Sequence, residues 1–132
     1  MDFDYINQLN KPEFQPPAIV FKVVWMILYI LMFWSLYIYL NTEPDGEKHK
    51  GIIIFIIQLT LNYMWSPIFF YYHKIFLALC VSVLLTISVF IMIICFYSAS
   101  KVAGIMNIPY FLWLCFADYL NYKLWILNAK YS

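Results

Sequence analysis

The stretch Ile75–Ser100, IFLALCVSVLLTISVFIMIICFYSAS, decides the fold because it has no charged residue from end to end. The hydrocarbon core of a bilayer is about 30 Å thick, so a helix needs about 20 apolar residues to cross it. Open strands are excluded in lipid because their backbone groups would lack hydrogen-bond partners. A barrel would need alternating apolar and polar residues, which this stretch lacks. The stretch therefore predicts a membrane-spanning helix.

Three further runs have the same character: Val23–Leu40, Gly51–Tyr72 and Ile105–Leu127. The first two have no charged residue, whereas the last carries Asp118 and Lys123. Polar or short connections separate the runs, and aromatic residues crowd most of their ends, as is typical of membrane interfaces. We predict one all-α domain over residues 1–132, a transmembrane helical bundle with spans at about 18–40, 51–72, 75–98 and 105–127.

The composition supports an integral, multi-pass membrane protein of a bacterial envelope or an organelle membrane. Hydrophobic residues make up 65% and charged residues 11%, with mean hydropathy +0.78, whereas soluble domains are about half apolar and a quarter charged. The acidic N-terminus lacks the basic start of a cleavable signal peptide. The chain has no Arg and a net charge of +1, so nucleic acid is excluded as a partner. The lysines divide evenly between the two ends of the spans, which leaves the orientation open.

The second span carries polar residues on one helical face. Gln58, Asn62 and Ser66 follow one another at four-residue spacing, and such a stripe should face the bundle interior or a cavity. Either it holds helices together by hydrogen bonds or it lines a ligand pocket. Pro67 follows, and we expect it to leave a carbonyl near Tyr63 without its partner and to kink the helix.

Two features of the third and fourth spans point to helix contacts. Ala78, Ser82 and Thr86 form a stripe of small residues, for which we predict close packing against another helix or another subunit. Asp118 is an ionisable group within a span and therefore a candidate functional residue. Its alternatives are a pair with Lys123 or a position close to the headgroups.

Aromatic residues supply the remaining candidates. Trp25 and Tyr29 are one turn apart, and Trp113 lies one turn after Pro109. Such rings either stack on a flat ligand, with the indole N–H as a polar contact, or serve as core and interface residues. The sequence shows no nucleophile with a base, no phosphate loop and no cluster of metal ligands. It therefore indicates no catalytic residue, no metal and no cofactor.

Long motifs in the right order resemble the translocator protein / tryptophan-rich sensory protein family (TspO/MBR). They fall in Tyr5–Pro17 (YINQLNKPEFQPP), Val20–Met32 (VFKVVWMILYILM), Gln58–Phe70 (QLTLNYMWSPIFF) and Pro109–Asn121 (PYFLWLCFADYLN). The resemblance covers nearly the whole chain. It implies a bundle of five transmembrane helices that is often a homodimer. It also implies binding of a tetrapyrrole such as protoporphyrin IX, or of a sterol, inside the bundle.

The resemblance also assigns site residues. Trp25 and Trp113 match the aromatic pocket positions, Asn62 matches the polar pocket residue, and Tyr5 matches the tyrosine of a lid segment. Together with neighbouring candidates, the predicted ligand contacts are Tyr5, Trp25, Tyr29, Asn62, Trp65 and Trp113.

The chain departs from the family pattern at several positions. The family's first helix precedes the lid segment, but here Met1 lies only a few residues before Tyr5, so we expect four spans. Phe33 stands where the family has a glycine, and Asp118 stands where it has a small or hydroxyl residue. These changes bear on helix approach and on oligomer geometry.

Three functions follow from this combination. We favour a membrane receptor or carrier for a flat hydrophobic ligand, with a tetrapyrrole ahead of a sterol. The first alternative is an enzyme that degrades porphyrin with light and oxygen, although no acid–base pair supports it. The second alternative is a structural or regulatory membrane subunit that needs a partner helix.

Overall fold

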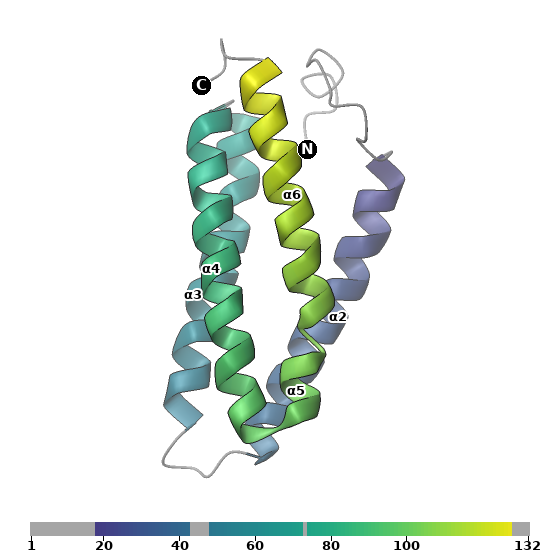
Figure 1. Cartoon of the computed structure of the whole chain (residues 1–132), viewed down its shortest axis with the longest axis vertical. Helices are drawn as coiled ribbons and strands as arrows, with labels where there is room; N and C mark the ends of the chain where they lie inside the picture. Colours follow the sequence, from purple (N-terminus) through teal and green to yellow (C-terminus); the bar gives the residue numbers. More distant parts are fainter. Residues whose placement is uncertain (1–17, 43–47, 73, 128–132) are drawn as a thin grey trace.

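The computed structural model describes residues 18–42, 48–72 and 74–127, and this part of the chain forms helices and no strand. Four of the described segments are long and apolar enough to cross a membrane, and they run alternately up and down beside one another (Figure 1). This confirms the predicted all-α transmembrane bundle. In chain order the elements are α2 (Ala18–Thr42), α3 (Lys48–Ser66), the π-helix η2 (Pro67–Tyr71), α4 (Ile75–Ala99), α5 (Lys101–Ile105) and α6 (Ile108–Leu127).

The last span consists of two helices rather than one. The sequence prediction placed a short connection before residue 105, but α5 already forms there and a turn at residues 106–107 separates it from α6. The Ser100 side chain accepts a hydrogen bond from the Ala103 N–H and so caps α5. Pro109 falls in the first turn of α6, where a missing backbone N–H is tolerated.

The helix type changes at Pro67, near the end of the second span, while the kink and the free carbonyl near Tyr63 stay predictions. The α-helix gives way at this residue to a π-helix, in which the Tyr72 N–H donates to the Pro67 carbonyl (3.0 Å). The Lys74 N–H donates to the Ile68 carbonyl (3.1 Å) and closes the turn into α4. Proline changes the helix pitch here because it cannot supply the N–H that an α-helix would use.

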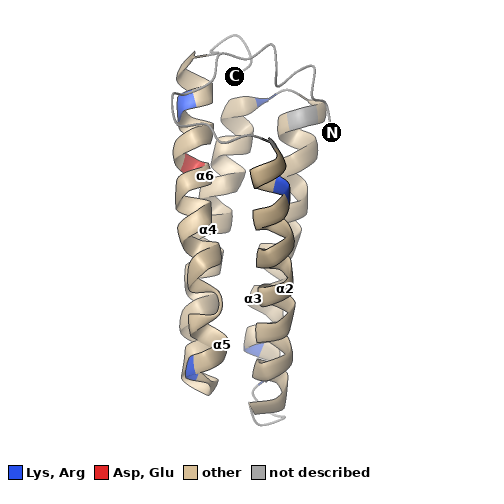
Figure 2. Ribbon diagram, turned by 90° about the vertical axis from the view of Figure 1, so that its right-hand side faces the viewer, with Lys and Arg blue, Asp and Glu red and all other residues tan. Residues whose placement is uncertain are grey.

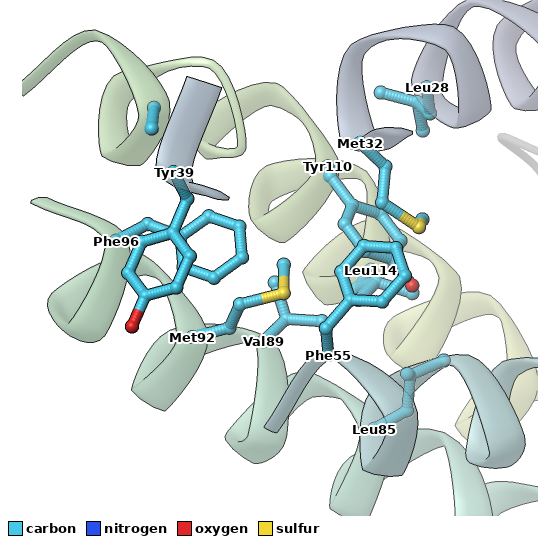
Figure 3. Packing of buried hydrophobic residues seen from close by; sticks show 11 residues of the cluster. Leu28, Met32, Tyr39, Phe55, Leu85, Val89, Met92, Phe96, Tyr110 and Leu114 are labelled. Carbon is cyan, nitrogen blue, oxygen red and sulfur yellow. The ribbon is translucent and has the colours of Figure 1, made fainter. Parts of the chain in front are cut away.

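The helix α4 lies at the centre of the bundle and packs along α3 on one side and α6 on the other. Buried side chains of α2, α3, α4 and α6 meet in one apolar core (Figure 3). At one end of this core Tyr39 stacks on Phe96, with ring centroids 4.5 Å apart. The Tyr39 hydroxyl also accepts a hydrogen bond from the Gly51 N–H (3.1 Å) and so ties α2 to the start of α3.

The stripe of small residues on α4 contacts another helix of the same chain. Ala78 and Ser82 are buried, and the hydroxyls of Ser82 and Thr86 contact Asp118 of α6. The stripe therefore packs against another helix of the same chain, which is one of the two partners that the sequence left open.

The outer surface of the bundle is as apolar as its core. Ile30, Leu84 and Phe90 are each more than half exposed, and the lysines of the described residues lie toward the two ends of the bundle (Figure 2). A surface of this kind fits a bilayer and not water. The protein is an integral, multi-pass membrane protein.

Candidate functional site

The predicted polar face of α3 points into the bundle at two of its three positions. Gln58 is fully buried and Asn62 is 9% exposed, whereas Ser66 is exposed. The prediction for Ser66 was wrong, since this last residue of α3 is exposed directly before the π-helix begins at Pro67. Gln58 and Asn62 therefore form a pair of amide side chains, one turn apart, on the interior face of α3.

A chain of hydrogen bonds joins this amide pair to two other helices. The Asn62 Nδ2 donates to the Tyr110 hydroxyl (2.8 Å), and that hydroxyl donates to the Gln58 Oε1 (2.8 Å). The Tyr29 hydroxyl donates to the Asn62 Oδ1. The Gln58 Nε2 makes a weaker contact with the Met32 Sδ (3.3 Å). We call Tyr29, Asn62, Tyr110 and Gln58 the interior polar chain.

Trp25 lies against the interior polar chain. Its ring centroid is 5.9 Å from that of Tyr29 and 6.1 Å from that of Tyr110, the latter in an edge-on arrangement. Tyr63 stacks on the other side of Tyr29 at 6.2 Å. These separations are within the range of favourable aromatic pairs. The structure thus brings together three of the predicted residues, Trp25, Tyr29 and Asn62, on facing sides of α2 and α3.

Next to this region an apolar groove of about 570 Å³ runs between α2 and α6. Trp113 lines it, with its ring 5.4 Å from Phe21 and 5.5 Å from Phe116. The Trp113 Nε1 is buried and has no hydrogen-bond partner among the described residues. The other lining residues are Val24, Ile27, Leu28, Leu31, Pro109, Leu112 and Phe116. We call this feature the α2–α6 groove.

Trp65 lies away from the groove, at the far end of α3. Its Nε1 donates to the Asn121 Oδ1 (2.9 Å), and the Asn121 Nδ2 donates to the Ile75 carbonyl (3.1 Å). Its ring stacks on Phe69 at 4.9 Å. This arrangement, which we call the Trp65 latch, links α3, α4 and α6. A role of Trp65 in ligand binding stays a prediction.

The remaining predicted residue, Tyr5, lies outside the described residues. Conversely, Tyr110 is a central member of the interior polar chain that the sequence analysis did not assign to the site. It falls in the Pro109–Asn121 motif one turn before Trp113, so the signal was present. Tyrosine near the start of a membrane helix is usually interfacial, and only the packing shows that this hydroxyl is buried.

The chemistry of the site is that of recognition. The interior polar chain holds neutral hydroxyl and amide groups, and the groove offers aromatic faces, while the indole N–H of Trp113 is buried beside it. No group of three His, Cys, Asp or Glu side chains within the described ranges could hold a metal ion. Such a site can bind a large apolar molecule with a few polar contacts.

Comparison with known proteins gives a consistent result. The model of the TspO/MBR family matches residues 2–126 of the chain. The tryptophan-rich protein TspO of Chlorobaculum tepidum is 38% identical over 125 residues, covering 94% of this chain and 79% of that protein. Protein CrtK of Rhodobacter capsulatus is 35% identical over 125 residues, covering 94% and 78%. The human translocator protein is 32% identical over 120 residues, covering 89% and 70%.

Proposed function

The chain belongs to the TspO/MBR family, and we propose on this premise that it is a membrane receptor or carrier for a flat hydrophobic ligand. A tetrapyrrole such as protoporphyrin IX is the favoured ligand, ahead of a sterol. The names of its relatives refer to translocation and sensing. For this chain we propose that the ligand binds between α2 and α6, against Trp113 and Trp25.

The observation that carries the proposal is the indole N–H of Trp113. A buried indole N–H normally has a hydrogen-bond partner, yet this one has none among the described residues, and its side chain lines an open groove. We propose that the Trp113 ring turns this N–H toward the α2–α6 groove when a ligand with an acceptor group binds there. A volume of about 570 Å³ lies within the usual range for small-molecule sites.

The interior polar chain supplies the second contact region. The Tyr29 ring lies 5.9 Å from the Trp25 ring, and its hydroxyl donates to Asn62. A ligand that displaces the Trp25 ring would therefore change this hydrogen bond. The apolar walls favour the macrocycle face, while amide and hydroxyl groups suit its polar substituents. This division of chemistry favours a porphyrin over a sterol, because a sterol carries fewer polar groups.

The test is a titration of the purified full chain in detergent with protoporphyrin IX, followed by the absorbance of the porphyrin. We expect saturable binding, and we expect Trp113→Phe to weaken it about tenfold, since the loss of one buried hydrogen bond is worth about 1.4 kcal/mol. One variant is a matched control, and a second tests the predicted role of Trp65. Trp34→Phe removes an exposed indole on the outer surface, and Trp65→Phe removes the indole of the Trp65 latch.

The controls decide between specific binding and general partition into the micelle. Unsaturable uptake, or equal affinity in the wild type and Trp113→Phe, contradicts the proposal. If Trp65→Phe weakens binding as much as Trp113→Phe does, the site extends to the far end of α3. Loss of the porphyrin itself under light, beyond its rate in empty micelles, would instead favour the enzyme alternative.

A further inference from the structure

Asp118 is the acidic residue that lies within the spans of the described chain, and it lies close to their middle. It is four residues from Leu114, the midpoint of the span Lys101–Leu127, which corresponds to about 6 Å along a helix axis. Its partner Thr86 is one residue from Ile87, the midpoint of α4. A charge at this depth is strongly disfavoured.

The partners of Asp118 are uncharged. Its two carboxyl oxygens contact the Ser82 and Thr86 hydroxyls of α4. Lys123, which the sequence left open as an ion-pair partner, instead places its Nζ 5.9 Å from the centre of the Tyr119 ring. Asp118 is thus held at the α4–α6 interface by hydroxyl groups and not by a cation.

The hydrogen bonds around Asp118 can be counted. The Thr86 Oγ1 lies 2.6 Å from the Asp118 Oδ2 and 2.9 Å from the Ser82 carbonyl oxygen, and the Ser82 Oγ contacts the Asp118 Oδ1. These are three contacts, but the two hydroxyls carry only one hydrogen each. A carboxylate has no hydrogen to add, so the Thr86 hydroxyl would have to share its one hydrogen between the Asp118 Oδ2 and the Ser82 carbonyl oxygen. A carboxylic acid supplies the third hydrogen.

We propose that Asp118, Ser82 and Thr86 form an intramembrane proton-binding site, in which the neutral acid closes a ring of hydrogen bonds between α4 and α6. In this ring the Ser82 hydroxyl donates to Asp118, the Asp118 acid donates to the Thr86 hydroxyl, and the Thr86 hydroxyl donates to the Ser82 carbonyl. Each donor has one acceptor. The proton bound at Asp118 comes from water and returns to water when the acid ionises.

The hydrogen-bond partners of Asp118 among the described residues are hydroxyl groups of α4, and the charged side chain on α2, the other helix packed against α6, is Lys22. On α6, Cys115 lies one turn before Asp118, and Tyr119, Tyr122 and Lys123 follow on its other side. On α4 the nearest titratable side chain in sequence is Cys80, which is exposed. Ionisation would therefore place an unpaired negative charge between the helices. The α4–α6 contact should loosen when the proton leaves.

The test is infrared spectroscopy of the full chain at neutral pH in an alkyl maltoside detergent, which has no carbonyl group of its own. We expect the carbonyl band of a protonated carboxylic acid in the wild type and its loss in Asp118→Asn. The other six of the seven acidic residues fall within residues 2–13 and 43–47, outside the spans. No such band in the wild type, or a band that persists in Asp118→Asn, overturns the proposal.

A second variant keeps the acid and removes its acceptor. Thr86→Val should shift the carbonyl band to higher frequency, because the acid loses its hydrogen bond, while Thr60→Val on the exposed face of α3 should leave it unchanged. An unshifted band in Thr86→Val contradicts the ring.

Stability supplies a readout that does not depend on spectroscopy or on any ligand. An amide at position 118 can donate and accept in the same directions as the neutral acid. We expect the melting temperature of the wild type to fall more steeply toward alkaline pH than that of Asp118→Asn, because only the wild type has this proton to lose. Parallel pH profiles contradict the proposal. Porphyrin affinity is not part of this test, so its outcome is independent of the proposed function.

Discussion

At the scale of single residues, the Tyr110 hydroxyl holds the interior polar chain together. It accepts from Asn62 and donates to Gln58, both at 2.8 Å. Tyr110→Phe keeps the ring but leaves the Asn62 Nδ2 and the Gln58 Oε1 buried without this partner. A buried polar group without its hydrogen bond costs about 1–3 kcal/mol. We expect a loss of that size in the free energy of unfolding, measured by titration with a denaturing detergent.

The matched control for this change is Tyr119→Phe on the same helix. Its side chain is 43% exposed, so we expect a change within about 0.5 kcal/mol. If Tyr110→Phe and Tyr119→Phe lower the free energy of unfolding equally, the buried hydroxyl of Tyr110 stabilises the protein no more than an exposed one. The interior polar chain would then not be a stabilising feature.

The sequence could locate some site residues and not others for a physical reason. Trp25 and Tyr29 were predicted and lie together, because the spacing of one helical turn fixes which residues of one helix share a face. On the same ground Asn62 was predicted to share an interior face with Gln58, and both are buried. Tyr110 and the partners of Trp65 were not predicted, because their contacts depend on how α6 is placed against α3. That register is a property of the packed bundle, and no local pattern encodes it.

At the scale of helices, Gly104 sets the distance between α4 and α5. A Cβ atom at this position would lie 2.6 Å from the Tyr97 Cβ and 2.8 Å from its Cα. The atoms in the way are the Cβ and the backbone of Tyr97, which a rotation of its side chain cannot move aside. We expect Gly104→Ala to lower the free energy of unfolding by about 1–3 kcal/mol, the usual cost of overpacking.

Two effects of opposite sign compete in this substitution. Alanine is favoured over glycine within a helix by about 1 kcal/mol, so the expected net loss requires that the clash exceed this gain. Val102→Ala, two residues earlier and exposed, is the control without a clash. A net stabilisation in Gly104→Ala would show that α5 can move away from Tyr97 at little cost.

The helices themselves were largely predictable, and their interruptions were not. Run length alone placed the four spans, because bilayer thickness fixes the length of a crossing helix. The break at residues 106–107 was missed, because α5 is too short to give a hydropathy signal of its own. The Ser100 side chain caps α5, and α5 packs closely against α4 at Gly104.

At the scale of the whole molecule, the α2–α6 groove opens on the outer, apolar surface. Ile27 lines this groove and is 48% exposed, while Ile30, one turn further along α2, is 57% exposed and is not among the lining residues. We expect Ile27→Trp to fill the groove and to weaken porphyrin binding at least about tenfold, measured by the same absorbance titration. Its thermal stability should not fall, because the ring enters space that is already open.

Ile30→Trp adds the same ring to the lipid-facing surface and should leave porphyrin affinity unchanged. Equal effects of the two variants would mean that the added ring acts through the micelle and not through the groove. If neither variant changes affinity, the ligand binds elsewhere, and the interior polar chain becomes the first place to look.

The ring of hydrogen bonds at Asp118 also limits the order in which the sequence can change during evolution. Loss of the acid leaves two hydroxyls that can still bond to their own helix, as Thr86 already does to the Ser82 carbonyl. Loss of either hydroxyl first would strand an acid in the middle of the bilayer. Ancestors that acquired an acid at position 118 should therefore have carried hydroxyls at positions 82 and 86 beforehand, and lineages that abandon the site should give up the acid first.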